Sequence, residues 1–159
     1  MTRAESFWDW SLNRYARAKP TLIALQDQYG FNVNMLLWCA WRGAAGDALD
    51  PARVGAALAA IARWHETVTR PIRTARRRLA EFGADGAELK PRASALELEA
   101  ERIEQRILET HASTAGGAPL PAPATALANL KLYAALAGGG RNAAYAEQLE
   151  ALAASLTDA

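Results

Sequence analysis

The stretch from Val33 to Trp41 constrains the fold more than any other part of the chain. Only Asn34 is polar in it, so a helix formed here is apolar around its whole circumference. Such a helix has to be surrounded by other elements, and this one is too short to cross a bilayer, which takes about 20 apolar residues. The sequence therefore predicts a helix over about residues 33–43 at the centre of a soluble domain.

Capping signals place this helix and its neighbours. Gly30 suits the left-handed residue that ends a helix, and Asn32 suits the N-cap of the next one. Ser6 begins an S-x-x-D capping box. Asp50 suits an N-cap, because a proline follows it at the first helical position. Pro20 fits the first turn of a second helix, which predicts that the first helix ends before it.

Helical periodicity continues through the rest of the chain. Pro71 either kinks or ends the helix that precedes it, and Ala84 to Pro91 is expected to be a loop. Leu96, Ile103 and Ile107 belong to the cleanest amphipathic pattern. No segment alternates as a strand does. The fold class is therefore all-α: a compact single-domain bundle of six to eight helices wrapped around the central helix.

Composition divides the domain into three parts. Residues 1–109 are expected to form a helical core, and residues 110–124 a linker rich in proline, alanine and glycine. Residues 125–159 are expected to form C-terminal helices that pack on the core. Short helices with one apolar face need such a partner surface, so a homodimer through these helices is the alternative.

Charge and cysteine content exclude several classes of protein. The net charge of +1 gives no electrostatic argument for nucleic acid or a membrane surface as a partner. A single cysteine, Cys39, excludes an internal disulfide framework, and the first ten residues lack the apolar core of a signal peptide. We expect a cytoplasmic protein.

Three segments resemble a known family. The sequences FWDWSLNRYA and LQDQYGFNVNMLLWCAW are similar to segments of an uncharacterised family of bacterial proteins of about 160 residues, with the patterns FWDWSLxxYA and LQDxxGxxVNxLLxxxW. The third segment is Trp64 to Leu79, with its proline and arginines. The resemblance covers roughly the first two thirds of the chain. The family usually has aspartate where this chain has Asn32, and either residue caps a helix. The resemblance supports the fold and implies no mechanism.

A polar set around the central helix is the first candidate site. Its polar members flank a helix end and a helix start, where backbone groups are free, so capping and turn fixing are the simpler explanation for them. The functional hypothesis is a ligand pocket with tryptophan walls. The candidate residues are Trp8, Gln26, Asp27, Asn34, Trp38, Trp41, Trp64 and His65.

An arginine cluster is the second candidate. Arg70, Arg73 and Arg77 share the face opposite the apolar stripe, so they form the candidate partner surface. Arg76 and Arg78 border that stripe and are placed to meet the glutamates of the next helix. Internal charge matching is the favoured use of the cluster, because the basic excess and the aromatic partners typical of nucleic-acid binding are missing.

No motif in the sequence indicates catalysis, a cofactor or a metal. His65 and His111 do not follow a glutamate by three positions, as carboxylate-bridged metal sites in helical bundles require. Cys39 lies in the apolar helix without a basic neighbour, and no phosphate loop or nucleophile elbow occurs. The favoured function is a non-catalytic binding or adaptor protein that engages another protein. The alternative is a small-molecule binder or enzyme that uses the polar centre around Asn34.

Overall fold

The computed structural model describes residues 5–112, 121–138 and 144–158. The part of the chain that it describes contains no strand, which confirms the all-α fold class. The expected number of six to eight helices is wrong. The described residues form five uninterrupted helical stretches, over residues 7–29, 33–44, 51–110, 122–138 and 146–157. The third stretch contains several helical elements that follow one another without a loop.

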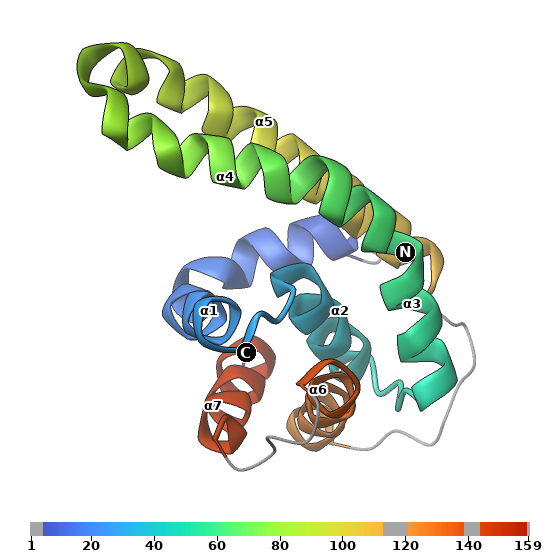
Figure 1. The fold of residues 1–159 in the computed structure, drawn as a ribbon. Coiled ribbons are helices and arrows are strands. Elements are labelled where there is room, and N and C mark those ends of the chain that lie inside the picture. The colour runs from blue at the N-terminus through green and yellow to red at the C-terminus, as the bar shows by residue number, and fades with distance from the viewer. Residues whose placement is uncertain (1–4, 113–120, 139–143, 159) are drawn as a thin grey trace.

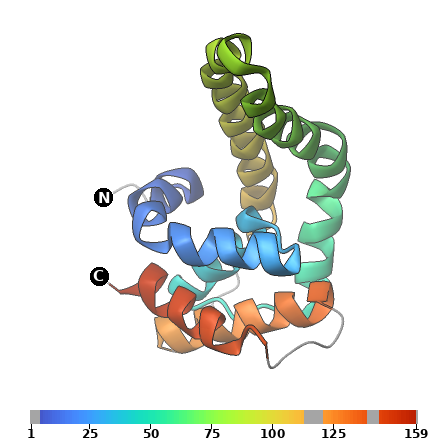
Figure 2. The ribbon, with the colours of Figure 1, turned by 60° about the vertical axis from the view of Figure 1, so that its left-hand side comes forward.

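Helix α1 (Phe7–Tyr29) forms where the capping residues predict. Ser6 Oγ accepts a hydrogen bond from the backbone of Asp9, and Gly30 ends the helix in the left-handed region with φ 71°. Pro20 does not begin a second helix, because it lies inside α1. A proline there removes one backbone hydrogen bond and bends a helix without ending it. Figure 2 shows the two halves of α1 at an angle to each other.

Helix α2 (Val33–Ala44) is the central helix, and Asn32 caps it by accepting from the backbone nitrogens of Asn34 and Met35. Every residue from Asn34 to Ala40 is buried. Its neighbours include α1, α5 (Gly83–Thr110), α6 (Ala122–Gly138) and α7 (Ala146–Thr157). The all-round apolar character that the sequence shows is therefore explained by contacts on several sides (Figure 1).

Pro71 kinks its helix and does not end it. Helix α3 (Pro51–Trp64) continues through a π-helical segment (His65–Thr69) into α4 (Arg70–Arg78). The amide of Arg70, the residue directly before Pro71, bonds to the carbonyl of His65, five residues back. The two helices meet at an angle in both views of the ribbon (Figures 1 and 2).

Helices α4 and α5 form an antiparallel hairpin that extends away from the other helices (Figure 1). The loop expected over residues 84–91 is wrong, because α5 begins at Gly83 directly after a 3-10 turn (Leu79–Phe82). This tight reversal requires glycine at two places. Gly83 has φ 59°, and a Cβ on Gly86 would lie 1.8 Å from the carbonyl oxygen of Leu79.

The C-terminal helices close the core around α2. Gly43 lies so near α6 that an added Cβ would be 2.3 Å from the Cα of Ala126. The hydroxyl of Tyr133 accepts a hydrogen bond of 2.9 Å from the backbone nitrogen of Asn32. Asn129 donates to the carbonyls of Cys39 and Asp47. The division at residues 110–124 stays a prediction, and residues 113–120 of that segment lie outside the described part of the chain.

None of the described helices combines the length and the apolar character that crossing a membrane requires.

Candidate functional site

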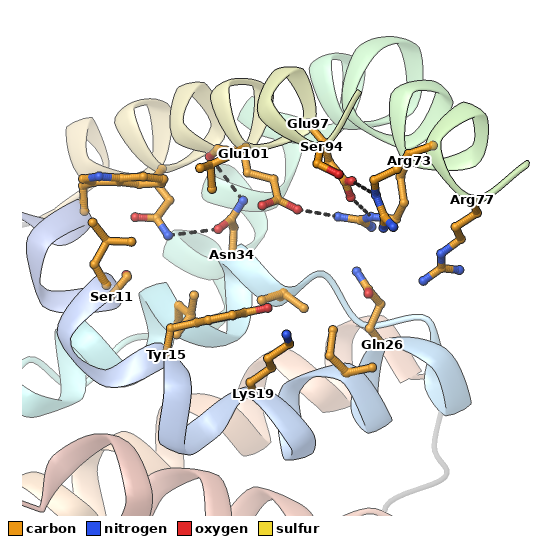
Figure 3. A pocket seen from close by; sticks show the side chains of 18 residues that line it. Ser11, Tyr15, Lys19, Gln26, Asn34, Arg73, Arg77, Ser94, Glu97 and Glu101 are labelled. Atoms are coloured by element: carbon orange, nitrogen blue, oxygen red, sulfur yellow. Dashed lines mark hydrogen bonds and ion pairs between the residues drawn. The ribbon is translucent and has the colours of Figure 1, made fainter. Parts of the chain in front are cut away.

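A groove of about 410 Å³ lies between α1 and the α4–α5 hairpin, with α2 as its floor. Figure 3 shows side chains from these four helices converging on it. Helix α1 contributes residues spaced by one turn, such as Ser11, Tyr15 and Lys19, so one face of this helix forms a whole wall. The opposite wall is the inner face of the hairpin.

A buried chain of hydrogen bonds lies behind one end of the groove, the inner end, where Ser11 and Gln105 line it. His65 Nδ1 lies 2.7 Å from Oε1 of Glu104, and Asn34 Nδ2 donates to Oε2 of the same carboxylate at 2.7 Å. Gln105 Nε2 then donates to Asn34 Oδ1 at 3.0 Å. Burial alone would raise the pKa of Glu104, but hydrogen bonds from His65 and Asn34 outweigh it and hold that pKa below its ordinary value.

This chain has a fixed direction because an ionised carboxylate can only accept. His65 and Asn34 must therefore point N–H groups at Glu104, and Asn34 presents its oxygen to Gln105. The amide nitrogen of Gln105 is used in that bond, which leaves its Oε1 as the free end of the chain. Neither Gln105 Oε1 nor Ser11 Oγ, another side chain of the groove lining, has a hydrogen-bond partner among the described residues.

Both of these polar groups are buried in residues that line the groove. Gln105 is 4% exposed and Ser11 is 3% exposed. Most buried polar groups in proteins are hydrogen-bonded, and leaving one unpaired costs about 1–3 kcal/mol. These two unpaired groups make the groove the candidate binding site.

Ion pairs stiffen the hairpin wall of the groove. Arg73 donates to Glu97 at 2.9 Å and to Glu101 at 2.8 Å, and Arg76 also bonds to Glu97. Burial would raise the pKa of Glu97, yet its bonds from Arg76 and Arg73 lower it. For Glu101 burial prevails over Arg73, and its pKa is raised. These pairs are the internal charge matching that the sequence favoured, made by Arg73 and Arg76.

Two cations at the other end of the groove, the outer end, do not bond to the glutamates of the hairpin wall. They are Lys19 and Arg77. Lys19 makes no ion pair with the described residues, and Figure 3 shows its ammonium directed into the groove. Arg77 reaches only Asp27, at 3.4 Å and with both side chains about half exposed. Between the ends, burial raises the pKa of Tyr15, and the charge of Glu101 adds to the effect.

Apolar side chains complete the groove. Leu12 on α1 and Leu98 on α5 both line it, and they are 53% and 50% exposed. Trp8 lines the same end as Ser11, and the guanidinium carbon of Arg102 lies 5.2 Å from its ring centroid. Large apolar side chains exposed on two facing walls are available to contact a bound molecule.

A second, smaller pocket of about 300 Å³ adjoins the groove and shares Gln26, Arg73 and Arg77 with it. His65 and Arg70 line this second pocket. The ring of His65 is already occupied by Glu104, and Arg70 is paired with Glu66 at 2.6 Å.

The structure distributes the residues of the predicted pocket over several places. Three of them, Trp8, Gln26 and Asn34, line the groove, whereas Asp27 and His65 line the smaller pocket beside it. The three other tryptophans of the predicted pocket line neither the groove nor the smaller pocket. Trp38 is fully buried, Trp41 stacks on Phe7 at 4.9 Å between ring centroids, and Trp64 donates to the carbonyl of Ala100.

The predicted partner surface is also divided. Arg70 and Arg77 are exposed, but Arg73 turns inward to the glutamates of α5. Sequence patterns did not predict Ser11, Tyr15, Lys19 and Gln105 as site residues. The spacing of the first three marks one face of α1, but nothing local indicates which helix faces them.

Within the described part of the chain, neither Cys39 nor a cluster of metal-binding side chains contributes to the groove. Cys39 is buried, burial raises the pKa of its thiol, and it lines neither pocket. Among the described residues, no group of three or more histidine, cysteine or acidic side chains is arranged to hold a metal ion.

Comparison with known protein families identifies the family of this chain. The family described as a protein of unknown function, DUF2390, matches residues 6–108. No curated protein and no solved structure matches the chain significantly. The matched residues include α1 to α4 and nearly all of α5, and therefore every residue that lines the groove. The chain belongs to the DUF2390 family of proteins of unknown function.

Proposed function

We propose that the protein is a non-catalytic binding protein and that the groove between α1 and the α4–α5 hairpin is its binding site. The observation that carries this proposal is the pair of buried, unpartnered polar atoms, Gln105 Oε1 and Ser11 Oγ, in residues that line an open groove. A bound molecule that donates a hydrogen bond there would satisfy groups that the fold leaves unpaired.

The use of the titratable groups supports binding over catalysis. His65 is hydrogen-bonded to Glu104, and it lines the smaller pocket and not the groove. Glu97 and Glu101 in the groove wall are bonded to Arg73. A general acid or base needs free reach to a reacting atom, whereas these side chains hold one another in place.

The dimensions of the groove favour a small molecule as its occupant. Small-molecule sites enclose about 300–1,000 Å³, and the groove's volume of about 410 Å³ falls in this range. Its mixture of apolar walls with a few convergent polar groups is also typical of such sites. In this respect the structure supports the alternative of the sequence analysis, a small-molecule binder around Asn34.

A dye that combines an apolar body with a negative charge tests the proposal. The probe is 1-anilinonaphthalene-8-sulfonate, whose fluorescence rises when it enters an apolar site. Replacing the groove leucines in a Leu12→Gln/Leu98→Gln variant should weaken its binding by about tenfold, equivalent to about 1.4 kcal/mol. Both substituted leucines are exposed, so folding should be unaffected.

The matched control is Leu89→Gln/Leu96→Gln, which changes two leucines of the hairpin that are 49% and 52% exposed and outside the groove. Its affinity should equal that of the unmodified protein. If instead the control variant loses the dye and the groove variant keeps it, the dye binds the outer face of the hairpin and the proposal is wrong.

A second function, engagement of another protein, has its own support. Phe82, Leu89 and Leu96 leave large apolar surfaces exposed along the hairpin, at 66%, 49% and 52%. On the C-terminal helices, Leu136 is 48% exposed, which supports the homodimer that the sequence allows. Light scattering on a size-exclusion column tests that assembly. A dimer that Leu136→Gln dissociates supports it, and a monomeric unmodified chain contradicts it.

A further inference from the structure

We propose that the groove binds an elongated amphipathic molecule with one acidic group at its Lys19 end, an apolar chain, and a hydrogen-bond donor at its Ser11 end. This inference rests on the proposed function, since it names the class of ligand for the same groove. Three features of the lining carry it, one for each part of the ligand.

The acidic group follows from the charges of the outer end. The lining contains four cationic side chains and two carboxylates, Glu97 and Glu101. Both carboxylates bond to Arg73, and Glu97 also bonds to Arg76. Lys19 makes no ion pair with the described residues, and Arg77 has only the half-exposed Asp27 at 3.4 Å, so the positive charge open to a ligand belongs to these two cations. A carboxylate of a ligand placed between these two would form charge-assisted hydrogen bonds. A ligand with several negative charges would meet Glu97 and Glu101 as well, which favours a single charge.

The apolar chain follows from the middle of the groove. Leu12 and Leu98 stand on its two walls, and Val33 and Leu37 of α2 line it below them. Contact with a chain would remove the exposed surfaces of both wall leucines from water, which favours binding.

The donor follows from the inner end. Gln105 Oε1 can only accept a hydrogen bond, and the chain from His65 through Glu104 and Asn34 fixes its orientation. Ser11 Oγ, in a residue that lines the same groove, can donate or accept. A hydroxyl or an amide N–H of the ligand fits these two atoms.

The length of the ligand follows from α1. Ser11 and Lys19 lie on one wall and are eight residues apart, which corresponds to about 12 Å along a helix. An extended ω-hydroxydecanoate has a comparable length and carries all three features. Decanoate lacks the donor, and decanol lacks the charge.

Isothermal titration calorimetry of the full chain with these three compounds tests the inference. We expect ω-hydroxydecanoate to bind most tightly, and decanol to bind at least about tenfold more weakly than decanoate. In Lys19→Gln the advantage of decanoate over decanol should largely disappear. In Ser11→Ala the advantage of ω-hydroxydecanoate over decanoate should shrink, while decanoate itself binds as before.

Arg78→Gln is the control for charge, because Arg78 is exposed on α4 and does not line the groove. Arg78→Gln should preserve the affinity ratio of decanoate to decanol and that of ω-hydroxydecanoate to decanoate. If decanoate and decanol bind equally and Leu12→Gln/Leu98→Gln weakens both, the ligand class is wrong and the proposed function stands. If neither these compounds nor the dye binds, the ligand class and the proposed function are both wrong.

Discussion

Asn34 Nδ2 donates a hydrogen bond to Oε2 of Glu104 across 2.7 Å, although the two residues are 70 positions apart in the chain. This bond joins the central helix to the inner face of the hairpin, on the side where the groove lies. It also sets the orientation of the Asn34 amide and, through it, that of Gln105. The polar residue of the central helix thus determines which atoms of the groove remain free.

Replacing Glu104 should destabilise the fold, because it is 1% exposed and is bonded to both His65 and Asn34. We expect Glu104→Ala to lower the free energy of unfolding by about 1.5–3 kcal/mol, the range for hydrogen bonds to charged groups. Urea denaturation measures this. Glu99→Ala, an exposed site on the same helix, should change it by less than about 0.5 kcal/mol. Equal losses in the two variants would show that the buried network contributes no stability.

The contact between α2 and α6 should not tolerate a methyl group at Gly43. An added Cβ would lie 2.3 Å from the backbone of Ala126, so Gly43→Ala must push α6 away and should cost about 1–3 kcal/mol. Gly55→Ala is the matched control, since nothing lies within 4 Å of its added Cβ. In the middle of α3 that change should stabilise by about 0.5–1 kcal/mol. Thermal melting of both variants checks the opposite signs, and a stabilised Gly43→Ala would contradict the packing.

The Asp47 ion pairs should make stability depend on pH. Hydrogen bonds from Arg53 outweigh the burial of Asp47 and, with Arg42, hold the pKa of its carboxyl below the ordinary value. The folded state therefore binds this proton less readily than the unfolded chain does. The stabilisation is present above the ordinary pKa of about 4 and is lost as the pH falls through the folded pKa.

Asp47→Asn should accordingly cost about 2 kcal/mol at about pH 7, and the difference from the unmodified protein should shrink toward about pH 3. Urea denaturation at several pH values measures the difference. Asp27→Asn is the control, because Asp27 is about half exposed and its partner Arg77 lies at 3.4 Å, so its effect should stay below about 0.5 kcal/mol. A pH-independent loss in Asp47→Asn would contradict the assignment.

Local signals in the sequence were sufficient to place the starts of the first three helices. Ser6, Asn32 and Asp50 cap them as predicted, because a cap depends on residues within one turn. The loop expected from Ala84 to Pro91 is wrong because its glycine and proline are local loop signals, while packing of α5 on α4 decides the conformation. Gly86 is needed for its close approach to Leu79, a contact that the sequence does not display.

The buried face of α5 was misjudged for a related reason. The apolar stripe placed Leu96 inside, but Leu96 is 52% exposed and Glu97 and Glu104 are buried. These glutamates recur at helical spacing, and their burial depends on partners from other helices, such as Arg73 and Asn34. Asn34 was recognised as the unusual residue of the central helix. The groove itself was beyond prediction because four helices form it, and one sequence does not reveal which faces meet.

The most direct test of the groove as a binding site is an NMR measurement on the full chain with labelled leucine methyl groups and the dye 1-anilinonaphthalene-8-sulfonate. We expect nuclear Overhauser effects from the dye's aromatic protons to the methyl groups of Leu12 and Leu98, which line the two walls. Effects confined to Leu89 and Leu96, which are exposed outside the groove, would contradict it.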